Sequence, residues 1–177
     1  MKYCLLIASA FLLLSSCTKV EPTTSKQDML RAEKWVLDTG FVRKQWKMDG
    51  TTVPADIDVT ETYNEPACKQ DDQLIFREGS EGAHIPGEAT CSINETAEVE
   101  FRWGLYENDT KMFIYDAKEF FGADVNADIV EFYNDKFGIR YSTYQDKHIT
   151  FPNQASYWVT DTTTYTLYFK KFVPKKE

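Results

Sequence analysis

Residues 97–106 carry the sequence AEVEFRWGLY, and this stretch decides the fold class. Apolar and charged side chains alternate along it, and the apolar ones are Val99, Phe101, Trp103 and Leu105. Successive side chains of a β-strand point to opposite faces, so this alternation predicts a strand with one buried and one solvated face. The polar residues 107–109 then predict a turn, and residues 111–116 return as the partner strand of a hairpin.

The same pattern continues on both sides of this hairpin. Further strands are predicted at residues 35–48, 73–77, 83–93, 128–133, 137–144 and 163–172, with a short continuation at 51–53. Ser25 is predicted to cap a short helix over residues 26–34. We therefore expect an all-β fold, an up-and-down barrel of about eight antiparallel strands with a short N-terminal helix, which leaves no exposed sheet edge. A two-sheet sandwich is the alternative.

Composition limits the function. The 177 residues are 42% hydrophobic and 15% aromatic, as expected for one globular domain. The net charge of −8 excludes the basic surface that nucleic-acid binding requires. His84 and His148 are the only imidazoles, we expect both in polar loops, and no G-x-S-x-G or H-E-x-x-H motif occurs. We predict a non-enzymatic protein with no cofactor, no metal site and no nucleic-acid partner.

The N-terminus predicts an export signal. Lys2 precedes an apolar run at residues 5–14, and such a run is far shorter than the roughly 20 residues that span a bilayer. The sequence Leu14-Ser15-Ser16-Cys17 resembles the lipobox of bacterial lipoproteins. This resemblance implies a signal peptide at residues 1–16, a lipid anchor (palmitate among its acyl chains) on Cys17, a tether at 17–28 and a domain at 29–174. Thr18, where an inner-membrane retention signal would have Asp, implies the outer membrane; whether the protein faces the periplasm or the exterior is left open.

Two cysteines remain once Cys4 is assigned to the signal peptide and Cys17 to the lipid. Cys68 and Cys91 are therefore predicted to form one disulfide, because exported proteins fold in an oxidising compartment. Two Cys without a nearby His or further Cys cannot complete a tetrahedral metal site. The adjacent Asp71 and Asp72 are interpreted as a turn or strand-entry feature near Cys68, with diverging side chains.

A family resemblance follows from these residues. Trp35 at the start of the first strand, the stretch CKQDDQLIF at 68–76 and the later Cys91 resemble the lipocalin-like domain lipoproteins of Gram-negative bacteria. The resemblance covers about residues 29–173. It implies a lipocalin-like barrel, and it implies little about activity.

Aromatic residues offer two functional hypotheses. Phe101, Trp103, Tyr141 and Tyr165 are predicted to point inward, where they either bind a small apolar ligand or simply fill the barrel. A second set is expected near strand ends and loops, where it would engage a glycan or an envelope protein: Tyr106, Tyr133, Tyr144, Tyr157 and Trp158. We expect an envelope-anchored binding or interaction module, with a carrier of a small apolar ligand as the alternative.

Overall fold

The computed structural model describes residues 24–48, 51–52, 59–89, 91, 98–150, 152 and 156–174. The predicted signal peptide, Cys17 and the first part of the predicted tether lie outside these residues. The same holds for Ala97 at the start of the hairpin and for residues 92–93 at the end of a predicted strand.

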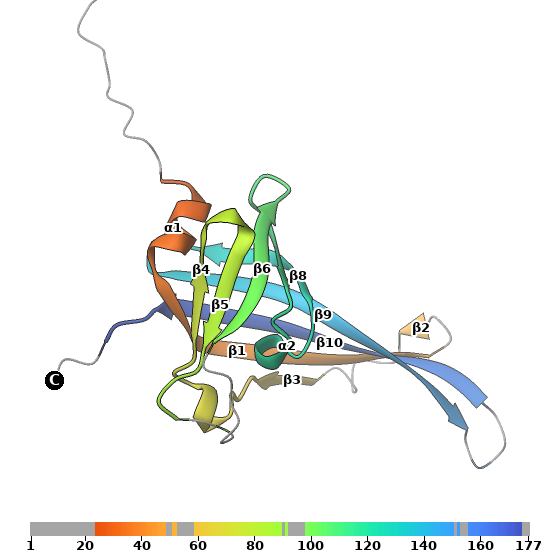
Figure 1. Cartoon of the computed structure of the whole chain (residues 1–177). Coiled ribbons are helices and arrows are strands. Elements are labelled where there is room, and N and C mark those ends of the chain that lie inside the picture. The colour runs from red at the N-terminus through yellow and green to blue at the C-terminus, as the bar shows by residue number, and fades with distance from the viewer. Residues whose placement is uncertain are drawn as a thin grey trace, which may run out of the picture.

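Eight strands of the described chain form a closed antiparallel barrel (Figure 1). They are β1 (Lys34–Met48), β4 (Gln73–Phe76), β5 (Glu81–Ile85), β6 (Val99–Tyr106), β7 (Lys111–Tyr115), β8 (Val125–Phe132), β9 (Lys136–Thr150) and β10 (Ser156–Lys171). Each of these strands pairs with the next, and β10 pairs with β1 to close the ring. Two further strands, β2 (Thr51–Thr52) and β3 (Val59–Thr62), both pair with β1. The predicted barrel is confirmed, and the sandwich alternative is wrong.

Short helices close the two ends of the barrel. Helix α1 (Lys26–Ala32) is capped by Ser25, whose Oγ accepts from the Asp28 amide at 3.1 Å, as predicted. Its Leu30 is fully buried, and the Leu30 carbonyl accepts a hydrogen bond of 2.9 Å from the Trp35 indole. Helix α2 (Lys118–Phe121) was not predicted and joins β7 to β8.

The barrel interior is occupied by side chains. Its largest fully buried members are Trp35, Trp103, Phe76, Phe137 and Phe169, each at most 1% exposed. The rings of Phe76 and Trp103 meet edge to face with centroids 4.9 Å apart, and Phe137 stacks on Phe169 at 4.8 Å. Close contacts between aromatic rings add to the stabilisation from burial. The interior is therefore a packed core.

Three strands run far beyond this core. Strands β1, β9 and β10 have 15, 15 and 16 residues, whereas the other barrel strands have 4–8. Their excess length forms a twisted ribbon that projects from the barrel (Figure 1). We call this ribbon the arm and define it as residues 41–48, 142–150 and 156–164, with β10 in its centre.

Candidate interaction surface

The arm has an outer face that continues the outside of the barrel. Leu167 and Phe169 of β10 point into the core, so the even-numbered residues of this strand point outward. The register places Trp158 opposite His148 and Thr162 opposite Tyr144 on that outer face. Phe41, Tyr144 and Trp158 are 43%, 72% and 63% exposed. Large aromatic rings are thus presented to solvent on the outer face of the arm.

The inner face of the arm mixes apolar and charged side chains, and its Val159 is only 4% exposed. Trp46, which is 43% exposed, lies on it opposite Asp161. Asp161 forms an ion pair with Lys147 across the ribbon. A shallow cavity of about 360 Å³ on the arm is lined by Trp46, Asp161 and Tyr165 among others. The inner face thus combines one exposed indole with paired charges.

A larger polar cavity lies where β8 and β9 diverge. Its volume is about 680 Å³, and both strands line it together with Arg43 and Thr164 at the base of the arm. Arg140 of β9 lies 3.7 Å from the carboxylate of Asp128 of β8, and Tyr144 borders the cavity. The arm therefore leaves the barrel beside a solvated recess.

Most of the aromatics expected near strand ends and loops do lie there: Tyr106 ends β6, Tyr133 follows β8, and Tyr157 and Trp158 lie at the start of β10. Tyr144 instead lies within β9, because this strand extends to Thr150. His148 also lies in β9, with its ring centroid 5.1 Å from that of Trp158. The prediction of a polar loop is therefore wrong for His148. The predicted strands ended at 144 and began at 163, whereas β9 runs to Thr150 and β10 begins at Ser156. Val159 is buried, whereas residues 160–164 are half-buried on both faces of β10, so this part of the sequence lacks the apolar alternation that marks a strand with one buried face.

The four predicted ligand-binding residues do point inward. Phe101 and Trp103 are at most 2% exposed, and the Trp103 indole donates to the Glu81 carbonyl at 2.7 Å. Tyr141 is 4% exposed and stacks on the half-buried Tyr165 with ring centroids 5.0 Å apart. Phe101 and Trp103 belong to the packed core, whereas Tyr141 and Tyr165 lie where the arm begins. Their binding of a ligand stays a prediction.

A cluster beside Tyr141 was missed by the sequence analysis. The ring of Tyr63 meets that of Tyr165 edge to face at 6.1 Å, and burial raises the pKa of both Tyr63 and Tyr141. Burial also raises the pKa of the Glu65 carboxyl. Tyr63 and Glu65 lie in an irregular segment after β3, where no periodic signal marks a residue as buried.

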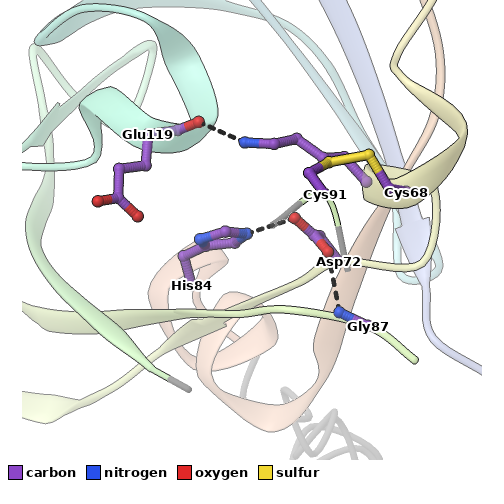
Figure 2. Close-up of a disulfide and its surroundings, with 7 residues drawn as sticks. Cys68, Asp72, His84, Gly87, Cys91 and Glu119 are labelled. Atoms are coloured by element: carbon purple, nitrogen blue, oxygen red, sulfur yellow. Dashed lines mark hydrogen bonds and ion pairs between the residues drawn. A yellow bond between two sulfur atoms is a disulfide. The ribbon is translucent and has the colours of Figure 1, made fainter. Parts of the chain in front are cut away.

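The disulfide lies beside a buried Asp–His pair (Figure 2). Cys68 and Cys91 are bonded, as predicted, with Cα atoms 5.2 Å apart. Nε2 of His84 lies 2.7 Å from Oδ2 of Asp72, and the other oxygen of Asp72 accepts from the Gly87 amide at 2.9 Å. His84 belongs to β5 and is 2% exposed, so the prediction of a polar loop is wrong for it as well.

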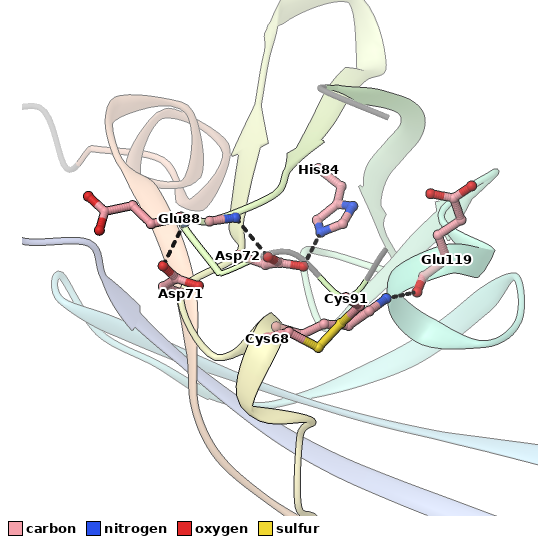
Figure 3. Close-up of polar contacts among 9 residues, drawn as sticks. Cys68, Asp71, Asp72, His84, Glu88, Cys91 and Glu119 are labelled. Carbon is pink, nitrogen blue, oxygen red and sulfur yellow. Dashed lines mark hydrogen bonds and ion pairs between the residues drawn. A yellow bond between two sulfur atoms is a disulfide. The ribbon is translucent and has the colours of Figure 1, made fainter. Parts of the chain in front are cut away.

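A second set of polar contacts ties this loop to its neighbours (Figure 3). Oδ2 of Asp71 accepts from the Glu88 amide at 2.8 Å, and Lys69 donates to the Glu119 carbonyl of α2 at 2.8 Å. The two Asp side chains have different partners on adjacent amides, with Asp72 buried and Asp71 half-buried, and Asp72 directly precedes β4 in a strand-entry position. A Cβ at Gly87 would lie 2.0 Å from Asp71, so glycine permits this close approach.

The Asp72–His84 pair is buried. Asp72 and His84 are at most 2% exposed, which keeps a substrate from reaching them. Within the described ranges, no group of three or more His, Cys, Asp or Glu side chains is placed to hold a metal ion. None of the helices in the described part of the chain has the length and apolar character to cross a membrane.

Comparisons of the chain with protein-family models, curated proteins and solved structures found no match.

Proposed function

We propose that this protein is a non-enzymatic lipoprotein of the cell envelope whose arm binds a partner. The lipobox-like sequence supports an anchor on Cys17, in the outer membrane as Thr18 implies. The observation that carries the interaction role is the arm itself, with Phe41, Tyr144 and Trp158 exposed on its outer face. Interfaces are enriched in Tyr and Trp, because these rigid rings bury a large area at a small entropic cost.

The position of the anchor relative to the arm supports this role. Helix α1 sits at the barrel end that carries the β6–β7 turn, since Lys26 donates to the Asp109 carbonyl at 2.7 Å. The arm leaves from the opposite end (Figure 1). The nine residues from Cys17 to Lys26 reach about 30 Å when fully extended. A lipid on Cys17 would thus hold the α1 end near the membrane and leave the arm accessible to a partner.

The carrier alternative has less support. A carrier needs an interior volume for its ligand, whereas Phe101, Trp103 and Tyr141 are packed with at most 4% of their surface exposed. The cavities at the base of the arm open on the surface and are lined largely by polar residues. We therefore place recognition on the arm.

A photo-crosslinking experiment in cells tests the proposal. A photoreactive phenylalanine analogue is installed at Tyr144 or Trp158 of the arm. The matched control is Tyr133, which is 57% exposed and lies in the β8–β9 turn at the α1 end. We expect a discrete adduct from the arm positions and none from Tyr133. Equal labelling at the three positions, or no adduct at any, would contradict the proposal.

A further inference from the structure

One edge of the arm is covered and the other is not. The β1 edge pairs with β3 over Phe41 to Lys44 and with β2 at Lys47 and Met48. Strand β9, on the other side, pairs with β8 only as far as Arg140. Beyond that point, no strand of the described chain pairs with the side of β9 that faces away from β10. A long exposed strand edge is a template for pairing with another chain.

The register shows which backbone groups this edge presents. The Tyr133 amide donates to the Lys136 carbonyl, so residue 136 of β9 faces β8, whereas the Asp135 carbonyl accepts from the amide of Lys171, the last residue of β10. The β9–β10 register then runs without interruption to Thr150 opposite Ser156. Because successive residues face alternate neighbours, the groups that face outward in the arm are those of Ser142, Tyr144, Asp146 and His148.

The charged side chains next to this edge, Asp146 and Lys147, contact β10 and do not cover the edge. Natural edge strands resist pairing by presenting charges such as lysine. Here Lys147 is drawn to Asp161 on the inner face, and Asp146 accepts from the Thr160 hydroxyl at 2.6 Å on the outer face. Both side chains are therefore directed toward β10, and the backbone groups on the opposite edge of β9 stay accessible.

We propose that the occupant of this edge is a second copy of the chain, whose β9 pairs antiparallel with the first about a two-fold axis at Gln145. The two arms would form one continuous sheet of six strands. This inference rests on the proposed function, since it names the partner of the arm. A two-fold contact presents the same surface on both copies, so one open edge supplies both halves of the interface.

The charges along β9 disfavour the two neighbouring registers on its C-terminal side. An axis at Asp146 would place two carboxylates directly opposite each other, and an axis at Lys147 would do the same with two ammonium groups. Like charges directly opposite are destabilising. An axis at Gln145 instead pairs Asp146 with Tyr144 and Lys147 with Thr143 of the other copy. It uses residues 142–148, all of which lie beyond the last residue paired with β8.

Cysteine crosslinking of the purified full chain tests this register. At the axis, the two Gln145 residues would form a non-hydrogen-bonded pair with Cα atoms about 4.5 Å apart, within the range that a disulfide bridges. The control is Lys147→Cys, on the same face and also exposed. Its two Cα atoms would be offset by four residues, or about 14 Å. Wild type is oxidised alongside to account for Cys4 and Cys17.

After oxidation with copper phenanthroline, we expect the Gln145→Cys chain to yield about tenfold more covalent dimer than Lys147→Cys. Equal yields from the two variants, or no dimer above wild type, would overturn the inference.

A second variant tests the edge without a new thiol. The Tyr144 amide faces outward, so Tyr144→Pro removes a donor from the edge and none from the pairing with β10. We expect sedimentation to give the mass of two chains for wild type and of one chain for the variant. A wild-type mass of one chain overturns the inference. If photo-crosslinking at Tyr144 then yields an adduct with another protein, the dimer fails while the proposed function stands; if it yields none, both fail.

Discussion

At the scale of single residues, Asp72 is the centre of the loop that the disulfide closes. Its carboxylate binds the His84 ring and the Gly87 amide at once, so it joins β5 to the loop after it (Figure 2). We expect Asp72→Ala to lower the free energy of unfolding by about 2–4 kcal/mol, because two donors lose their partner, one of them deeply buried. Urea denaturation of the oxidised protein measures this loss.

Asp71→Ala is the matched control. Its bond to the Glu88 amide is exposed, so water replaces the lost acceptor and we expect a loss of less than about 1 kcal/mol. Equal losses for the two variants would contradict the central role of Asp72.

Glu65 provides a pH-dependent prediction. Burial raises the pKa of its carboxyl, with Asp72 adding to the shift and the Tyr63 hydrogen bond, Lys69 and His84 opposing it. The folded state therefore binds the proton more tightly than the unfolded chain does. At neutral pH the ionised, half-buried carboxylate is destabilising, and stability recovers as the pH falls through the folded-state pKa.

We expect Glu65→Gln to be more stable than wild type at pH 7. This advantage should shrink on acidification and be lost below the ordinary glutamate pKa of about 4.3. Urea denaturation of both proteins from pH 4 to 8 measures the difference. A difference that grew as the pH fell would mean that the pKa is lowered instead.

At the scale of elements, the strands with one face in the core were predictable. Residues 99–106 pack Phe101 and Trp103 inward and leave Glu100 and Arg102 exposed, so burial imposes the period of two that the sequence displays. The turn at Glu107, Asn108 and Asp109 was also predictable. All three adopt positive φ angles of 50–59°, a conformation that Asn and Asp tolerate better than most residues.

The arm and the buried polar residues were not predictable from the same signals. Val159 is buried, but residues 160–164 are half-buried on both faces, so nothing selects an apolar alternation there, and Thr160, Thr162 and Thr164 resemble a loop in composition. His84 appeared to belong in a loop because a lone histidine carries no sign of its partner. Its partner, Asp72, is twelve residues away and becomes its neighbour only when β4 and β5 pair.

At the scale of the whole molecule, the barrel supplies the packed core and the arm supplies the exposed surface. The barrel buries the apolar surface and fixes the base of three long strands, which then extend into solvent with their pairing intact. A packed barrel of eight strands is just wide enough for its own side chains. If the barrel only supports the arm, its interior should be packed. If the barrel is a carrier, its interior should hold free volume for a ligand.

Replacing Trp103 tests whether the interior is packed or hollow. In a packed interior, Trp103→Ala removes a ring that contacts Phe76 and a hydrogen bond to the Glu81 carbonyl, so we expect a loss of about 3–5 kcal/mol in the free energy of unfolding. Wild type should not enhance the emission of an apolar fluorescent probe. Trp158→Ala, which removes the same side chain from the exposed arm, should cost less than about 1 kcal/mol. If wild type bound the probe strongly and Trp103→Ala lowered the free energy of unfolding no more than Trp158→Ala, the interior would be a cavity open to a ligand. Recognition would then belong inside the barrel, because an unfilled core has volume for a ligand that a packed one lacks.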